Sequence, residues 1–224
     1  MISLCKEIPK IQKLNVETIK INCTHNSYKD IALFWTQDNG RAVISMLDGN
    51  MVIYNNNANL EELREFINVI SPQSVFSDEK TLEALFGQDF YRVSVMLSNC
   101  KFESDLQSDV ANSDEIYKLL DVKGLELPSY EHFAVDFCHR LNHGHLKYFA
   151  LKNICVAVCI SDGQAVLLNG IASHRKGMGS VALCGVLSQY SVPKFAVCDK
   201  AVEDFYLKNN FSRSYYAGYW RNPF

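Results

Sequence analysis

The sequence predicts an α+β protein with two related lobes. Three observations support this fold class. Short apolar runs of strand length alternate with segments of helical length along the chain. The same order of segments occurs in the first and in the second half. In the second half, an apolar strand leads through a glycine-containing loop directly into a helix, an arrangement that suits phosphate binding.

The repeat is clearest where three predicted strands follow one another. Residues 32–55 align with residues 146–169 without a gap, and each segment contains two apolar runs followed by a tight turn into a third. The turn is Asp48-Gly49 in the first half and Asp162-Gly163 in the second. We therefore expect the same three-stranded unit in both halves.

A second pair of similar segments extends the repeat toward the end of each half. Residues 81–86 resemble residues 201–206, and each segment follows a short apolar strand. Between the halves, a polar, acid-rich stretch precedes a short helix that is expected to end at Leu120. We place the boundary there, with a first lobe over residues 1–120 and a second over residues 121–224, although a linker that packs against both halves fits this stretch equally well.

Composition favours a soluble protein. The chain of 224 residues has 48% hydrophobic and 21% charged residues, which is ordinary for a globular fold. Its net charge of -3 gives no reason to expect a nucleic acid or an anionic membrane as partner. The N-terminal segment is interrupted by Lys6, Pro9 and Lys10, so it has no apolar signal-peptide core. No later segment approaches the roughly 20 apolar residues of a membrane span. We expect a cytoplasmic protein.

The loop between the third strand and the following helix of the second half carries the main functional signal. It contains Arg175, Lys176, Gly177 and Gly179. Glycines let the backbone approach an anion closely, and the free N–H groups and the dipole of a helix N-terminus attract negative charge. Two basic residues at the loop can pair with phosphate oxygens. We prefer a phosphate site to the simpler alternative, a glycine turn with solvated basic residues.

The spacing of this loop excludes two common nucleotide motifs. The nucleoside triphosphate loop G-x-x-x-x-G-K-[ST] is absent, and G-x-G-x-x-G fails because Ala182 occupies the third glycine position. Instead, the sequence HRKGMGS resembles the coenzyme A pyrophosphate loop of the GCN5-related N-acetyltransferases, whose motif is [Q/R]-x-x-G-x-[G/A]. Residues 195–211 look like the final strand and helix of that family, with Tyr206 five residues before Phe211. The resemblance covers roughly residues 130–220.

The resemblance implies a mixed, mostly antiparallel, splayed sheet flanked by helices, with acetyl-CoA as co-substrate and no metal. The strand before the loop would bind the pantetheine arm, and the loop would bind the pyrophosphate. The implied cofactor-binding residues are Asn169, Gly170, Ile171, Ala172, His174, Arg175, Lys176, Gly177, Met178, Gly179, Ser180 and Asp199. Tyr206 would be the general acid for the departing thiolate.

This chemistry suits a Tyr hydroxyl, because a leaving thiolate benefits from a nearby proton donor. The alternative for Tyr206 is an aromatic side chain that packs on the sheet. In the first half the matching residue is Phe86, which has no proton to donate, and residues 56–59 replace the glycine loop. The first half therefore looks like a degenerate copy that kept the scaffold and lost the cofactor site.

Some residues depart from the family pattern. His174 occupies the Gln/Arg position, Asp199 replaces the usual Asn at the last helix, and Asn210 replaces a Gly. No carboxylate lies on residues 165–172, so the general base is not identified. His139 and His143 would share a helix face, which would suit a metal site. A full set of four metal ligands is not evident, so we predict a solvated helix end instead.

The expected reaction is direct attack of a primary amine on the thioester, catalysed by an acyl-CoA-dependent N-acetyltransferase. Tyr130, Glu131 and Tyr219 are candidate substrate-binding residues, although surface or packing roles suit them better. Two other hypotheses stay open: a non-catalytic acyl-CoA-binding or regulatory protein, and an assembly module whose loop binds another anion. The sequence does not identify the acceptor amine, the acyl chain, the role of the first lobe or the oligomeric state.

Overall fold

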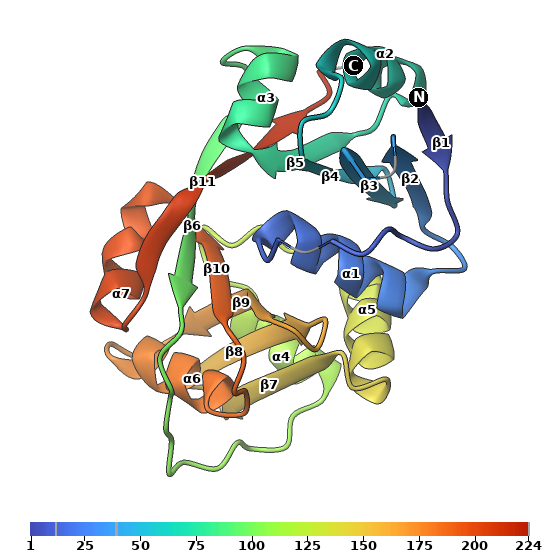
Figure 1. The fold of residues 1–224 in the computed structure, drawn as a ribbon. Helices are drawn as coiled ribbons and strands as arrows, with labels where there is room; N and C mark the ends of the chain where they lie inside the picture. Colours follow the sequence, from blue (N-terminus) through green and yellow to red (C-terminus); the bar gives the residue numbers. More distant parts are fainter. Residues whose placement is uncertain (12, 39, 224) are drawn as a thin grey trace. The chain divides into compact units, whose positions relative to one another are not determined.

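The computed structural model describes residues 1–11, 13–38 and 40–223, and the chain forms two compact units. Unit 1 comprises Met1–Met96, Val197–Leu207 and Ser212–Phe224, whereas unit 2 comprises Leu97–Ala196 and Lys208–Phe211. Compactness therefore assigns most of the C-terminal segment to unit 1, whereas the sequence repeat assigns it to the second lobe. The lobe boundary after residue 120 stays a prediction about the repeat. Each helix and strand is described below with the unit that holds most of its residues. Figure 1 labels these helices and strands.

Unit 1 is a sheet with helices on both faces. Its strand order is β1-β2-β3-β4-β5-β11-β6. Strands β4 and β5 are parallel, and the pairs β1–β2, β2–β3, β3–β4 and β5–β11 are antiparallel. The elements are β1 (Ile2–Leu4), α1 (Val16–Tyr28), β2 (Leu33–Gln37), β3 (Ala42–Leu47), β4 (Asn50–Asn55), α2 (Leu60–Ile70), β5 (Ser74–Asp78), α3 (Glu79–Phe86), β6 (Tyr91–Ser98), a short 3₁₀ helix η1 (Lys200–Val202), α7 (Glu203–Lys208) and β11 (Ser212–Arg221).

Side-chain alternation along β3 explains why both faces of this sheet are covered. Ile44 is buried in a cluster with Leu63 of α2 and Leu82 of α3. Its neighbour Val43 points the other way and is buried with Ile21 of α1. Because successive residues of a strand face opposite sides, α1 covers one face, and α2 and α3 cover the other.

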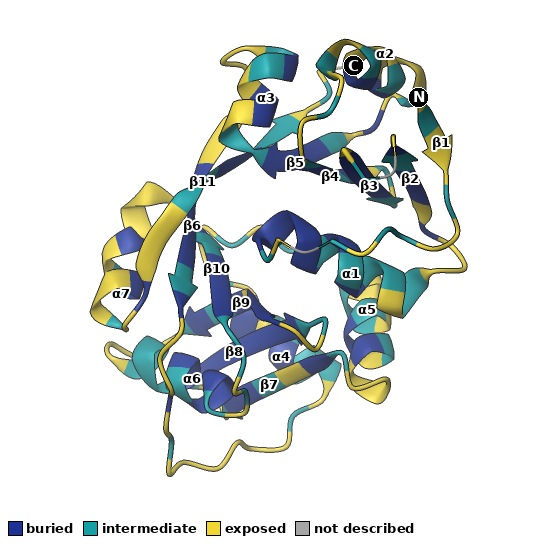
Figure 2. Cartoon of the chain, in the orientation of Figure 1, coloured by how far each residue is buried: buried dark blue, intermediate teal, exposed yellow. Residues whose placement is uncertain are grey.

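Unit 2 repeats this plan on a smaller sheet of order β10-β9-β8-β7. Strands β9 and β10 are parallel, and β7–β8 and β8–β9 are antiparallel. Figure 2 shows β8 as buried along nearly its whole length. The elements are α4 (Ser113–Leu120), α5 (Tyr130–Asn142), β7 (Leu146–Leu151), β8 (Cys155–Ser161), β9 (Val166–Ser173), α6 (Met178–Leu187) and β10 (Lys194–Cys198).

Two glycines fix how the helices pack on this sheet. Gly185 of α6 lies so close to Phe149 of β7 that an added Cβ would be 2.3 Å from the ring. On the other face, a Cβ on Gly170 of β9 would be 3.1 Å from Leu120 of α4. Phe149 and Gly170 lie on opposite faces because their cross-strand partners, Ala157 and Val158, are successive residues of β8. Helix α6, which begins at the loop, is thereby held close to the sheet.

The predicted fold class is confirmed: each unit has a mixed, mostly antiparallel sheet flanked by helices. The order of elements α1–β2–β3–β4–α2–β5–α3 recurs as α5–β7–β8–β9–α6–β10–α7. Both predicted Asp-Gly turns are present. Gly49 and Gly163 adopt φ values of 75° and 87°, which glycine tolerates without steric cost.

The segment between the halves is part of unit 2. The hydroxyl group of Tyr148 on β7 accepts a hydrogen bond from the Ala111 N–H and donates one to the Ala111 carbonyl. The Asp109 N–H donates to the Ala150 carbonyl at 2.8 Å. This segment therefore covers the edge strand β7, which protects it from pairing with other chains. The short helix α4 that follows is capped by Asn112 in a capping box with Glu115.

Candidate functional site

The glycine loop of unit 2 forms a compact turn between β9 and α6. Gly177 is the N-cap residue of α6 and has a φ of 84°, a left-handed conformation that favours glycine. The Ser173 side chain accepts a hydrogen bond from the Arg175 N–H and donates one to the Arg175 carbonyl. The Met178 N–H donates to the same carbonyl at 3.2 Å. The loop conformation is thus set by local hydrogen bonds before any ligand binds.

The N-terminus of α6 is open to an anion. No side chain caps the helix, and its first turn contains no acidic residue. Arg175, Lys176 and Gly177 are exposed. The first amide groups of a helix have no intrahelical acceptor and carry the positive end of the helix dipole. This end of α6 therefore offers N–H donors and two exposed cationic side chains to a phosphate group.

The equivalent helix of unit 1 begins differently. Asn59 caps α2, and its side chain accepts hydrogen bonds from the N–H groups of Glu61 and Glu62. Both of these residues are acidic and lie in the first turn. A carboxylate near a helix N-terminus stabilises the dipole and repels a second anion. The start of α2 is therefore already satisfied by the protein itself.

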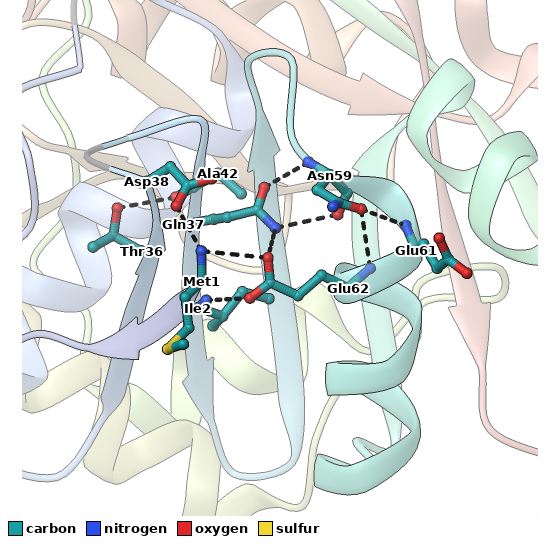
Figure 3. Close-up of polar contacts among 9 residues, drawn as sticks. All are labelled: Met1, Ile2, Thr36, Gln37, Asp38, Ala42, Asn59, Glu61 and Glu62. Carbon is teal, nitrogen blue, oxygen red and sulfur yellow. Dashed lines mark hydrogen bonds and ion pairs between the residues drawn. The ribbon is translucent and has the colours of Figure 1, made fainter.

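A polar network extends this self-capping (Figure 3). The Glu62 carboxylate accepts hydrogen bonds from the Gln37 side-chain amide at 2.7 Å and from the Ile2 N–H at 2.5 Å. The α-ammonium group of Met1 lies 2.5 Å from Asp38 and 3.5 Å from Glu62. Carboxylate and ammonium groups thus fill the α2 terminus of unit 1, which supports the prediction that this half lost its phosphate site.

Strand β9 presents an open backbone edge before the loop. Its parallel pairing with β10 ends at Leu168, opposite Ala196, whereas its pairing with β8 continues to Ser173. A bulge falls at Asn169, because Val158 pairs with Gly170 while Cys159 pairs with Leu168. The predicted pantetheine-binding residues Asn169, Gly170, Ile171 and Ala172 follow the point where β9 and β10 stop pairing.

In unit 1 the corresponding strands also stop pairing. The parallel pairing of β4 with β5 ends at Val52, opposite Phe76. The Ser77 hydroxyl then donates a 2.8 Å hydrogen bond to the Ile53 carbonyl. A side chain of the protein therefore occupies a backbone acceptor of β4. In both units the parallel pair of strands therefore stops pairing before the loop that follows, and in unit 1 a side chain contacts the strand backbone beyond that point.

His174 differs from the other predicted loop ligands. The ring Nε2 atom of His174 lies 3.1 Å from the Leu119 carbonyl at the end of α4. The backbone N–H of His174 donates to the Ile154 carbonyl. It lines a cavity of about 320 Å³ whose wall includes the charged residues Asp109, Glu115, Lys118 and Lys152. The Asp109 side chain accepts a hydrogen bond from the Lys152 N–H, and that of Glu115 accepts one from the Asn112 N–H. The His174 ring therefore anchors the loop to α4 in this structure.

Tyr206 and Asp199 belong to unit 1. Tyr206 lies on α7 and is 5% exposed, with its ring edge-on to Phe205 at 5.2 Å. Asp199 is exposed at the N-cap position of η1, and its side chain makes no capping hydrogen bond. Phe86, the match to Tyr206 in the repeat, stacks on Trp220 at 4.3 Å. The sequence-predicted general acid is thus a buried helix aromatic within its own unit.

The three candidate substrate-binding residues lie in two places. Tyr130 and Glu131 begin α5 of unit 2, and the Tyr130 ring lies edge-on to Tyr117 at 5.4 Å. Tyr219 lies on β11 of unit 1, opposite Phe76, with ring centroids 4.8 Å apart. Tyr130 and Glu131 are neighbours in sequence and lie in unit 2, whereas Tyr219 lies in unit 1.

Sequence reasoning missed a buried polar pair in unit 1. Glu17 on α1 is 1% exposed, and its Oε2 atom accepts a 2.7 Å hydrogen bond from the Tyr215 hydroxyl on β11. Burial is the main cause that raises the pKa of the Glu17 carboxyl to about 7, and nearby Asp78 adds to it. A Glu in the first turn of a helix is usually solvated. No local pattern could have identified Glu17, because its partner lies 198 positions away.

Over residues 1–11, 13–38 and 40–223, no group of three or more His, Cys, Asp or Glu side chains is placed to hold a metal ion. No helix among these described residues is both long and apolar enough to cross a membrane.

Comparison with known proteins shows the fold. No protein-family model matches the chain, and no curated protein matches it in sequence. A GCN5-related N-acetyltransferase from Kribbella flavida is similar in structure, with a TM-score of 0.53 and 12% identity over 83% of this chain and 88% of that one. A putative acetyltransferase from Pyrococcus horikoshii has a TM-score of 0.54 and 10% identity over 89% of this chain and 76% of that one.

A tandem GNAT protein from the clavulanic acid biosynthesis pathway is also similar, with a TM-score of 0.56 and 8% identity over 95% of this chain and 89% of that one. The chain therefore has the GCN5-related N-acetyltransferase fold in two lobes, as the sequence predicted. At identities this low, the likeness shows the fold and leaves the reaction to be argued from the site.

Proposed function

We propose that the chain is an acyl-CoA-dependent N-acyltransferase that moves an acetyl group from acetyl-CoA to a primary amine. One observation carries the proposal: α6 begins without any side-chain cap, directly after Arg175, Lys176 and Gly177, whereas α2 is capped by Asn59 and carries acidic residues in its first turn. Because the two lobes share one fold, the starts of α6 and α2 can be compared directly. The uncapped start of α6 suits phosphate binding, and the capped, acidic start of α2 does not.

The residues of unit 2 fit coenzyme A. The open edge of β9 offers backbone donors and acceptors that suit the amide groups of a pantetheine arm. The loop N–H groups and the exposed Arg175 and Lys176 suit a pyrophosphate. When bound, the co-substrate would supply an acyl group activated as a thioester. The chain would orient this group and provide hydrogen-bond donors to the developing oxyanion.

Tyr206 is the proposed general acid. A Tyr hydroxyl can give its proton to a departing thiolate and recover it from water afterwards. Unit 2 has no carboxylate on residues 165–172, so the attacking amine would have to arrive neutral or lose its proton to water. We propose a cytoplasmic protein with a primary amine as acceptor, and we propose Tyr130, Glu131 and Tyr219 as residues that contact the acceptor.

A steady-state assay tests the proposal. Purified protein is incubated with acetyl-CoA and a panel of primary amines, and the free thiol of released coenzyme A is measured. Amine-dependent thiol release by the wild type, with a large loss in Tyr206→Phe, is the expected result. Thiol release that no amine stimulates would refute the transferase proposal.

A non-catalytic acyl-CoA-binding protein is the second candidate. Two observations favour it: β9 lacks a carboxylate that could act as base, and Asp199 replaces the usual Asn at the last helix. Both candidates require acetyl-CoA to bind at the α6 loop, and only the transferase releases coenzyme A when an amine is added. Binding by calorimetry without turnover across the amine panel would therefore favour the regulatory protein.

A further inference from the structure

Glu17 of unit 1 is a buried acidic residue to which the proposed reaction gives no role. It lies in the first turn of α1 and is 1% exposed. Its Oε2 atom accepts the Tyr215 hydroxyl at 2.7 Å. Among the residues that the structure describes, its Oε1 atom has no hydrogen-bond partner and no solvent contact. Leaving an ionised carboxylate half-satisfied in the interior is costly.

Tyr215 connects this carboxylate to the start of the helix. Its hydroxyl donates to Glu17 and accepts a 3.0 Å hydrogen bond from the Val16 N–H, the first amide of α1. One hydroxyl group on β11 therefore holds both the side chain and the backbone of the first turn of α1. A second contact joins the same two elements, because the Lys20 ammonium of α1 lies 5.7 Å from the centre of the Tyr219 ring of β11.

The surroundings make the charge on Glu17 unfavourable. Burial is the main cause that raises the pKa of the Glu17 carboxyl, and Asp78 at the end of β5 adds to it. The hydrogen bonds from Tyr215 and from the Glu17 backbone lower this pKa, and Lys20 on α1 lowers it less. The Lys20 ammonium lies 4.6 Å above the Phe76 ring. On β4, burial raises the pKa of Tyr54, and the charge on Glu17 raises it further. On β11, burial and the charge on Glu17 raise the pKa of Tyr215, so the Tyr215 hydroxyl stays protonated.

We propose that Glu17 and Tyr215 form a proton-controlled latch that fastens the first turn of α1 to β11. With Glu17 protonated, the latch is closed at little electrostatic cost. With Glu17 ionised, release of the first turn to water becomes more favourable, because water solvates both carboxylate oxygens. The latch operates within unit 1 and does not depend on the proposed transferase activity.

The direction of the pH effect follows from linkage. The carboxyl of Glu17 has a pKa of about 7 in the closed state, compared with 4.5 for an exposed Glu. The closed state therefore binds the proton more tightly. The proton's stabilisation of the closed state is complete below pH 4.5 and declines between pH 4.5 and 7. Above pH 7 this stabilisation is lost, and the opening equilibrium no longer depends on pH. Between pH 5.5 and 8.5, the opening equilibrium constant should rise roughly 30-fold.

Residue-resolved amide exchange by NMR measures the latch directly. The Val16 amide exchanges when the latch opens, and its rate is corrected for the intrinsic pH dependence of amide exchange. In the wild type we expect its protection to fall roughly 30-fold from pH 5.5 to 8.5. In Glu17→Gln the protection should not depend on pH. In Tyr215→Phe it should be low throughout, because Val16 loses its acceptor.

Two controls make the result decisive. Glu61→Gln removes an exposed carboxylate on α2 and should behave as the wild type. The Ile53 amide in the buried strand β4 reports global unfolding. Wild-type Val16 protection that changes less than about 3-fold would overturn the proposal, as would the same change at Ile53. A pH dependence that persists in Glu17→Gln would also overturn it.

Discussion

Replacing Glu17 by Gln should change how the stability of unit 1 depends on pH. The wild-type carboxyl has a pKa raised from 4.5 to about 7 in the folded state. A raised pKa in the folded state stabilises the fold at low pH, and this stabilisation is lost as the pH rises toward 7. At about 1.4 kcal/mol per pH unit, the full effect is about 3 kcal/mol, and most of it falls between pH 5 and pH 8.

Gln cannot titrate, so it removes this dependence. Its buried amide lacks a partner for the N–H₂ group, which costs about 1–3 kcal/mol at every pH. The informative quantity is therefore the change with pH in the difference between the two proteins. The wild type should lose about 2–3 kcal/mol of stability relative to Glu17→Gln as the pH rises from 5 to 8.

Tryptophan fluorescence during urea unfolding measures the stability of unit 1. The chain has two tryptophans, Trp35 and Trp220, and both lie in unit 1. Unfolding curves at pH 5, 6, 7 and 8 give the free energy of unfolding of each protein. If the difference between wild type and variant moves by less than about 0.5 kcal/mol, or in the opposite direction, the assigned burial of an ionisable Glu17 is wrong.

Three other changes test the packing of α6 and the proposed site. Gly185→Ala should destabilise unit 2 by about 1–2 kcal/mol, because a Cβ would lie 2.3 Å from Phe149 and only part of the overpacking cost is recovered through better helix propensity; urea unfolding followed by circular dichroism checks this, and unchanged stability would contradict it. Arg175→Ala and Lys176→Ala should each weaken acetyl-CoA binding roughly 3- to 10-fold and reduce its salt dependence; calorimetry at two salt concentrations would show no effect if the loop does not bind phosphate. Tyr206→Phe should lower kcat roughly 100-fold at unchanged acetyl-CoA affinity, and an unchanged kcat would remove Tyr206 from the reaction.

Local patterns allowed much of the fold to be predicted. The alternation of apolar runs and the Asp48-Gly49 and Asp162-Gly163 turns identified the repeated strands, because strand length and turn chemistry depend on neighbouring residues. The loop at Gly177 was predicted for the same reason. It combines a strand end, a glycine conformation and a helix start within a few residues.

The features that the sequence did not reveal depend on distant partners. Pairing of β11 with β5 joins Ala217 to Asp78, and strand pairing over such a separation leaves no mark in periodicity. The His174 ring contacts the Leu119 carbonyl, which a motif alignment cannot show. No local pattern distinguishes Glu17, because its partner Tyr215 lies 198 positions away.

The sequence predicted only part of what happens at the start of α2. The sequence showed that residues 56–59 replace the glycine loop, which predicted the loss of a phosphate site. It did not show that Asn59 caps the helix or that Gln37 and Ile2 hold the Glu62 carboxylate at its start. These contacts give a physical reason to expect no phosphate site at the start of α2.

The most direct test of the central claim is calorimetric binding of acetyl-CoA to the wild type, to Gly177→Glu and to Gly163→Glu. Gly177 and Gly163 are matched: both are exposed glycines of unit 2, with φ values of 84° and 87° and open space around the missing Cβ. Only Gly177 lies at the start of α6. We expect the wild type and Gly163→Glu to bind acetyl-CoA with micromolar affinity, and the folded Gly177→Glu protein to lose binding. No binding by the folded wild type, or equal binding by both variants, would contradict the assignment of this loop as the coenzyme A site.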